Sequence, residues 1–259
     1  MSPIRIVPTE FTSDGEIVRG DFVVPSGGGP FPGVCKFHGL PDGDQVSGVA
    51  SKLASAGFLV LTFDFRGFRR SDGIFRLSRE IEDAGHAVTH LLRSELSMKG
   101  WVGVYGASYG GAVAICSAAR DRRISCVCVR APVYDTLAFA RSPIIQPAVD
   151  ALLKNDPKAV HGLADPDLRK QILDWMIEDG ARFNPMSEIS RISPRPLLVI
   201  AGDVDEGVDL AGVRRLFELA REPKEFVVVK GADHELTNPN AYETTMDRAV
   251  SWFRRQRPE

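Results

Sequence analysis

The chain has 259 residues, of which 44% are hydrophobic and 25% charged, and its formal net charge is −2. This length suits one large α/β domain that buries a substantial core. The absence of a basic excess argues against nucleic acid or an anionic membrane as partner, and no segment is apolar over the length of a membrane span.

Two strand-like stretches come first, residues 4–11 and 17–25, separated by Asp14-Gly15, a pair typical of a tight hairpin turn. The remainder alternates between strands and helices. The expected strands are residues 33–38, 58–65, 101–107, 125–131, 196–201 and 225–229; the expected helices are residues 45–56, 78–96, 109–120, 210–220 and a C-terminal helix with one apolar face. This pattern predicts a mostly parallel sheet of about eight strands with helices on both faces.

Residues 133–193 interrupt the alternation, because they contain helical pieces and prolines but no convincing strand. Asp165-Pro166 is a typical helix start, with aspartate as N-cap and proline in the first turn. An ordinary crossover helix with long loops would also fit. About sixty residues exceed what a crossover needs, so we expect a single domain over residues 1–259 with a helical cap at about 133–193. Its apolar residues would roof a pocket: Phe139, Ile144, Ile145, Trp175 and Phe183.

The 4 cysteines lie in apolar stretches and lack C-x-x-C spacing, which argues against a zinc or redox site. They are Cys35, Cys116, Cys126 and Cys128. We expect buried free thiols, with Cys126 and Cys128 on the same face of one strand. The N-terminal residues lack the apolar core of a secretory signal, so a reducing cytoplasm is the expected location.

The sequence Gly106-Ala107-Ser108-Tyr109-Gly110 lies between an expected strand and an expected helix. By itself G-x-S-x-G is a weak signal. At a strand-to-helix junction, however, it has a mechanical purpose, because the serine occupies a strained turn that only small neighbours permit. Ser108 is therefore the candidate nucleophile.

A serine hydroxyl needs an adjacent base, and the base needs an orienting carboxylate. In this arrangement the acid and then the histidine should follow the serine along the chain. Only His161 and His234 follow Ser108. His161 lies in the expected cap, whereas His234 follows the last strand, at the sheet edge where reactive groups gather. We therefore expect His234 to be the base.

The acid should follow the strand at residues 196–201, where four carboxylates occur: Asp203, Asp205, Glu206 and Asp209. Asp203 is nearest to the strand end and could cap the turn. Asp205 is better placed to reach the His234 loop, so the spacing favours Asp205 and leaves the other three as alternatives.

Two backbone N–H groups should stabilise the oxyanion of the tetrahedral intermediate. Tyr109, directly after the serine, should provide one. Within His38-Gly39-Leu40-Pro41 the proline has no N–H, which leaves Leu40 as the second donor. His38 precedes the serine and is interpreted as a residue that shapes this loop.

Taken together, these motifs resemble the α/β-hydrolase superfamily. The resemblance rests on His38-Gly39, Asp64-Phe65-Arg66-Gly67, Gly106–Gly111, Gly202-Asp203-Val204-Asp205 and Gly231-Ala232-Asp233-His234. The chain is similar to the dienelactone-hydrolase and acyl-peptidase-like group of small esterases, which includes cinnamoyl and feruloyl esterases. In that group the triad acid is the aspartate two residues after the Gly-Asp pair, which corresponds to Asp205.

The sequence departs from this family at Arg69, where glycine is common, in a loop that lies near the acyl pocket of such enzymes. Substrate preference is therefore open. A serine at position 108 argues against halide-releasing relatives, which need aspartate, and against dienelactone hydrolase itself, which suits cysteine.

We expect a serine carboxylesterase that cleaves small soluble esters through an acyl-enzyme, without metal or organic cofactor. The alternatives are a serine peptidase or amidase acting on short peptides, and a non-catalytic ligand-binding member of the fold. A homodimer is possible through the edge strands or the cap.

Overall fold

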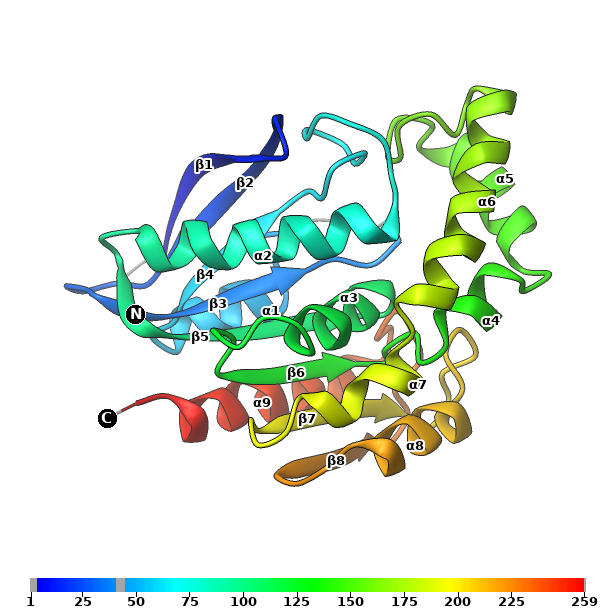
Figure 1. Ribbon diagram of the computed structural model, residues 1–259. Coiled ribbons are helices and arrows are strands. Elements are labelled where there is room, and N and C mark those ends of the chain that lie inside the picture. The colour runs from blue at the N-terminus through cyan, green and yellow to red at the C-terminus, as the bar shows by residue number, and fades with distance from the viewer. Residues whose placement is uncertain (1–3, 41–44, 259) are drawn as a thin grey trace.

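The computed structural model describes residues 4–40 and 45–258, and its framework is one eight-stranded sheet (Figure 1). The strands are β1 (Arg5–Ser13), β2 (Glu16–Val24), β3 (Phe31–Phe37), β4 (Leu59–Phe63), β5 (Ser97–Ala107), β6 (Cys126–Arg130), β7 (Leu197–Gly202) and β8 (Lys224–Val229). Their spatial order is β1-β2-β4-β3-β5-β6-β7-β8. The β1–β2 hairpin is antiparallel and the strands from β4 to β8 pair in parallel, as predicted.

Helices cover both faces of the sheet. They are α1 (Val49–Ser55), α2 (Leu77–Arg93), α3 (Tyr109–Ala118), α4 (Thr136–Ala140), α5 (Ile145–Asn155), α6 (Pro166–Arg182), α7 (Pro185–Glu188), α8 (Leu210–Leu219) and α9 (Pro239–Gln256), with a short 3₁₀ turn η1 (Ile189–Arg191). The buried residues of α1 and α9 form one apolar core, and those of α2, α3 and α8 belong to a second. Figure 1 shows α2 and α3 in front of the sheet and α1 and α9 behind it.

The central strands contribute alternate residues to the two cores, because successive side chains of a strand point to opposite faces. In β6, Val127 and Val129 face the α2–α3 side, whereas Cys126 and Cys128 face the α9 side. All four cysteines are buried and free, which confirms that prediction. Strands buried on both faces account for the nearly continuous apolar runs in the sequence.

Between β6 and β7 the chain forms helices and turns and adds no strand to the sheet, and we name residues 133–193 the helical segment. Helices α5 and α6 of this segment stand beside one end of the sheet (Figure 1). Helix α6 begins as predicted: the Asp165 side chain accepts hydrogen bonds from the N–H groups of Asp167 and Leu168, and proline occupies the first turn. In the described part of the chain, no helix has the length and apolarity to cross a bilayer.

Candidate active site

Ser108 occupies the sharp turn between β5 and α3, with φ 53° and ψ −123°. A residue other than glycine at positive φ is strained, and such strain persists only where the surroundings enforce it. The flanking glycines make the turn possible. A Cβ on Gly106 would lie 2.2 Å from the carbonyl oxygen of Gly110, and one on Gly110 would lie 2.4 Å from that of His38. The strand–turn–helix context predicted from the sequence is therefore present.

The structure brings His234 into contact with Ser108. His234 lies in the loop that follows β8, and its Nε2 is 3.0 Å from the Oγ of Ser108. With the ring proton on Nδ1, Nε2 accepts the hydrogen bond from the serine hydroxyl. Gly207 lies against the imidazole, since a Cβ there would be 3.0 Å from Cγ of the ring.

Asp205 completes the group. Nδ1 of His234 is 3.1 and 3.0 Å from the two carboxylate oxygens of Asp205. Oδ1 also accepts hydrogen bonds from the N–H groups of Gly207 and Val208, at 2.9 and 2.8 Å. Burial alone would raise the pKa of Asp205, but the hydrogen bond from His234 and those from the two amides outweigh it, so the pKa lies below its ordinary value.

The three alternative carboxylates have other positions. Asp203 accepts a hydrogen bond from the N–H of Gly231 at 2.6 Å, and Glu206 is exposed. Asp209 is the N-cap of α8 and accepts a hydrogen bond from the Tyr134 hydroxyl at 2.5 Å. Of the four, Asp205 is the carboxylate that contacts His234.

One expected oxyanion donor, Tyr109, directly follows Ser108, and the other, Leu40, directly follows a glycine that lies against the serine. Tyr109 begins α3, and Gly39, which precedes Leu40, lies against the serine, because a Cβ on Gly39 would be 3.3 Å from Cβ of Ser108. Within the described ranges, neither the Tyr109 nor the Leu40 amide donates a hydrogen bond to another residue. Pro41, on which the choice of Leu40 partly rested, lies outside the described residues.

The two remaining histidines named from the sequence hold loops. Nε2 of His38 accepts a hydrogen bond from the N–H of Phe65 at 3.0 Å, so Nδ1 carries the proton and donates to the carbonyl of Gly39 at 2.7 Å. His161 lies in the helical segment, with ring nitrogens 3.2 Å from the Gly73 carbonyl oxygen and 3.1 Å from that of Arg69. Neither histidine contacts Ser108.

An apolar cavity of about 90 Å³ lies between the helical segment and the core. Its lining consists of Leu40, Phe75, Phe139, Ile145, Ala148, Val149, Leu152, Val160, Leu163, Ile172, Leu173 and Met176. Leu40 links the cavity to the loop beside Ser108, and the Tyr109 ring packs against both Phe75 and Phe139, with ring centroids 6.0 and 5.6 Å apart. The cavity therefore adjoins the serine turn.

The sequence identified the roof of this cavity only in part. Phe139 and Ile145 line it, as expected. Ile144 is 48% exposed, and Trp175 and Phe183 instead pack against the guanidinium groups of Arg76 and Arg120. The expectation was wrong for these three because helical periodicity does not reveal which neighbour covers each face.

The loop that follows β4 forms one side of this region, and its departure from the family pattern has a structural role. Arg69 has φ 40°, a conformation that favours glycine. Its amide donates to the carbonyl of Ala159 at 3.2 Å and its guanidinium to Asp156 at 2.9 Å, while Phe68 and Val160 form an isolated β-bridge. Arg69 thus ties the loop to the helical segment.

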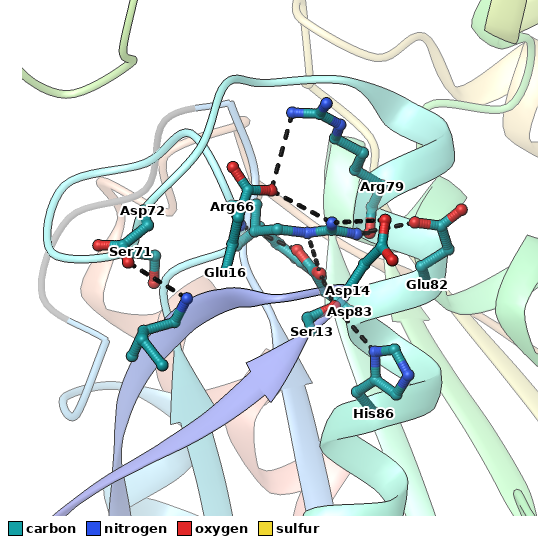
Figure 2. Close-up of polar contacts among 12 residues, drawn as sticks. Ser13, Asp14, Glu16, Arg66, Ser71, Asp72, Arg79, Glu82, Asp83 and His86 are labelled. Atoms are coloured by element: carbon teal, nitrogen blue, oxygen red, sulfur yellow. Dashed lines mark hydrogen bonds and ion pairs between the residues drawn. The ribbon is translucent and has the colours of Figure 1, made fainter.

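Arg66 holds the same loop from the other side (Figure 2). This arginine is 1% exposed, and its Nε and backbone N–H donate to the two oxygens of Asp83 at 2.6 and 2.9 Å. Glu82 and Glu16 accept further bonds from the guanidinium at 2.8 and 3.3 Å. Arg66 was noted in the sequence as part of a family motif, but its partners, which come from β2 and α2, were not predicted.

A second arginine at the site, Arg130, was not predicted from the sequence. Nη1 of Arg130, at the end of β6, donates to the carbonyl oxygen of His234 at 2.7 Å. In the sequence Arg130 only ends an apolar strand, and no local pattern connects it with a loop 104 residues away.

Across the described ranges, no cluster of three or more histidine, cysteine, aspartate or glutamate side chains could hold a metal ion.

Two relatives align over most of the chain. Polyketide transferase grgF from Penicillium sp is 23% identical, with 95% of each chain covered. Polyketide transferase ATR5 from Stachybotrys chlorohalonatus (strain IBT 40285) is 25% identical over 86% of this chain and 87% of its own.

Solved structures show the same fold. The crystal structure of the α/β hydrolase GrgF from Penicillium sp. sh18 covers 97% of this chain and 99% of its own, at 23% identity and a TM-score of 0.77. The ferulic-acid complex of Est1E from Butyrivibrio proteoclasticus covers 96% and 98%, at 16% identity and a TM-score of 0.78. At such identities the likeness establishes the fold, which is that of the α/β hydrolases.

A family model also matches this chain. The model described as X-Pro dipeptidyl-peptidase (S15 family) matches residues 14–143, half of the 259-residue chain. The matched range includes Ser108 and ends before Asp205 and His234. The resemblance to α/β hydrolases is confirmed, and the chain belongs to the S15 family within that superfamily.

Proposed function

We propose that this α/β hydrolase is a serine carboxylesterase that cleaves small apolar esters through an acyl-enzyme. The supporting observation is the chain of contacts from Ser108 Oγ to His234 Nε2 at 3.0 Å and from His234 Nδ1 to Asp205 Oδ2 at 3.0 Å. A nucleophile, a base and an orienting carboxylate linked in this order are what acyl transfer needs.

In the proposed first step, His234 takes the proton of Ser108 while Oγ bonds to the ester carbonyl carbon. The backbone N–H groups of Tyr109 and Leu40 donate to the resulting oxyanion. Collapse of the tetrahedral intermediate breaks the bond to the alcohol, which leaves with the proton from His234. In the second step water gives one proton to His234 while its oxygen bonds to the acyl carbon; the bond from that carbon to Oγ then breaks, His234 returns the proton to Oγ of Ser108, and the acid is released. Asp205 stabilises the imidazolium and stays ionised throughout.

The cavity supports an apolar substrate. Among the residues that the structure describes, all of its lining side chains are apolar, and its volume of about 90 Å³ is below the ~150 Å³ of an engineered apolar cavity that binds benzene. A short apolar acyl or alkyl group would therefore fit, whereas a charged group would lose its hydration without a compensating partner.

Peptide hydrolysis, the activity in the description of the S15 family, remains the first alternative. An enzyme that releases dipeptides must recognise the charged N-terminal amine of its substrate, which calls for a carboxylate at the binding site. None of the described residues that line the cavity is a carboxylate, so this observation favours the ester. Rates with p-nitrophenyl esters and with aminoacyl-anilides separate the two: anilide turnover above ester turnover would favour the peptidase.

Acyl transfer to an acceptor other than water is a second candidate, favoured by the two relatives named as polyketide transferases. The same acyl-enzyme would form, and an alcohol or thiol would replace water in the second step. If p-nitrophenyl butyrate is turned over in the presence of short alcohols, mass spectrometry should detect the new ester. A product that is only butyric acid at every alcohol concentration would exclude transfer to these acceptors.

Labelling by a fluorophosphonate tests the central proposal and also separates it from a non-catalytic binding role. The protein should be labelled at Ser108, and Ser108→Ala should abolish labelling and lower p-nitrophenyl acetate turnover on the order of 10⁶-fold. Ser117→Ala is the matched control, because this serine lies on the adjoining helix α3 with no hydrogen-bond partner for its hydroxyl in the described structure. A wild-type protein that resists labelling, or a Ser108→Ala variant of native rate, would refute the proposal.

A further inference from the structure

Arg130 connects the main chains that carry Ser108 and His234. As the last residue of β6, it pairs with Ala107 of β5, and its carbonyl oxygen accepts a hydrogen bond from the N–H of Ser108 at 3.0 Å. Its Nη1 donates to the carbonyl oxygen of His234 at 2.7 Å. One residue therefore bonds to the backbone of both partners in the 3.0 Å contact between serine and imidazole.

The Arg130 side chain lies on the face of the sheet that packs against α1 and α9. Strand alternation places it on the same face of the sheet as Cys126 and Cys128, which pack in the core formed with α1 and α9. Arg130 does not line the cavity. Among the residues that the structure describes, no carboxylate forms an ion pair with it, so the His234 carbonyl is the partner that orients this charge.

The loop that holds His234 has no regular secondary structure to fix it. It follows β8 and precedes α9, and it contains two residues at positive φ, Gly231 at 72° and Leu236 at 55°. Asp205 orients the imidazole through Nδ1 but does not bond to the loop backbone. Elsewhere in the loop, the Gly231 amide donates to Asp203 and the Ala232 carbonyl accepts from the Val204 amide, whereas the main chain of His234 itself is held by the charge-assisted hydrogen bond from Arg130.

We propose that Arg130 is a positioning residue, which keeps His234 within hydrogen-bond reach of Ser108 by joining the two main chains. This inference rests on the proposed function of Ser108 and His234. Since Arg130 lies outside the cavity, its loss should impair proton transfer and leave substrate binding unchanged.

The first test compares Arg130→Gln with Arg195→Gln. Arg195 is a matched control because it is also partly exposed and donates to main-chain carbonyls, those of Ala118, Asp121 and Ile124, but it precedes β7 at the opposite end of the sheet. Arg130→Gln should lower kcat for p-nitrophenyl acetate about 10- to 100-fold, as small misplacements of catalytic groups do, with KM within about twofold. Arg195→Gln should reduce the midpoint of thermal unfolding without changing kcat.

The second test asks whether a guanidinium group alone restores the rate. Arg130→Ala should be labelled by fluorophosphonate more slowly than the wild type, and millimolar guanidinium chloride should recover part of both labelling rate and kcat. Arg130→Lys, which keeps a cationic donor, should retain more activity than Arg130→Gln and serves if the other variants do not fold.

The outcomes separate this inference from the function on which it rests. Absence of labelling in the wild type would refute the proposed function. Normal labelling in the wild type with an equal rate in folded Arg130→Gln would overturn the role of Arg130 alone. A fall in kcat that Arg195→Gln reproduces, or that neither guanidinium nor lysine relieves, would likewise overturn it.

Discussion

The described part of the chain contains two groups in which serine, histidine and aspartate are in contact, and of these the group at Ser108 has the arrangement of a nucleophile with its base. In the first, His234 lies between Ser108 and Asp205. In the second, Ser13 lies in the middle: its hydroxyl donates to Asp83 at 2.5 Å and is 2.8 Å from Nδ1 of His86 (Figure 2).

The order of contacts decides what each group can do. His234 faces Ser108 with one ring nitrogen and a carboxylate with the other, so it can take the serine proton. The Ser13 hydroxyl donates its hydrogen bond to Asp83, so Nδ1 of His86 must be the protonated nitrogen that donates to the Ser13 oxygen. Ser13 and Asp83 are also fully buried, and Asp83 is bonded to Arg66, so no substrate could reach them. Residue types alone do not define a site; connectivity and access do.

Replacing Asp205 and Asp83 in turn should give the largest difference between the two groups, one variant losing activity and the other stability. Asp205→Asn should lower kcat about 10⁴-fold, because the amide no longer holds the imidazole in the required tautomer. Asp83→Asn should leave the activity of the folded protein near native but destabilise it by about 3–5 kcal/mol, since Arg66 loses its buried partner. The measurements are p-nitrophenyl acetate kinetics and urea unfolding. The comparison fails if Asp83→Asn abolishes turnover in protein that is still folded.

Ser13→Ala tests the inner group directly. The variant should retain its esterase rate within about twofold and lose about 1–3 kcal/mol of stability, because Asp83 loses a buried hydrogen-bond donor. Circular dichroism melts and steady-state kinetics on the same preparation provide both numbers. A rate loss comparable to that of Ser108→Ala would assign catalysis to the wrong serine.

The comparison extends to buried carboxyl groups with and without partners. Glu80 is fully buried, neither oxygen has a hydrogen-bond partner in the described structure, and burial with the nearby Asp83 charge raises its pKa well above the ordinary 4.5. Because the pKa of Glu80 is higher in the folded than in the unfolded chain, its contribution to stability is fully present below pH 4.5 and is lost as the pH rises. Asp205 has a lowered pKa, so its contribution is present above its ordinary 3.8 and lost as pH falls.

Glu80→Leu should therefore stabilise the protein by about 1–3 kcal/mol at pH 8, because it removes an unsatisfied buried polar group, with a smaller gain at pH 4. Asp205→Asn should instead remove stability that the wild type has at pH 8 and loses on acidification. Urea unfolding from pH 3 to pH 8 measures both slopes. Equal gains in stability from Glu80→Leu at pH 3 and at pH 8 would contradict the raised pKa of Glu80.

The smallest effect is expected at the contact between Arg69 and Asp156, which joins the β4 loop to the helical segment. Their side chains are 35% and 42% exposed, so Asp156→Asn should cost only about 0.2–1 kcal/mol, and 1 M salt should abolish the difference. A larger loss that persists in salt would mean that this contact is part of the core.

Local sequence patterns predicted the sheet and most of its helices, and they singled out Ser108 and His234 and favoured Asp205. Alternating apolar strands and helices are local patterns, and a glycine-flanked serine at a strand end has one mechanical explanation. His234 and Asp205 followed because both come after parallel strands, whose carboxyl ends lie along one edge. These inferences needed only periodicity, chain order and turn geometry.

Contacts between side chains far apart in the sequence became evident from the folded chain alone. Arg130 reaches His234, Asp83 joins Ser13 to Arg66, and Trp175 packs on Arg76 rather than on the cavity. Glu80 is buried because α2 packs against the core, which its local sequence does not indicate. Such partners depend on how helices and loops pack over the sheet. A contact between two distant side chains produces no periodic pattern in the sequence around either of them. The sequence thus placed the groups that would break the bond, whereas packing selected the residues that hold them and shaped the cavity beside them.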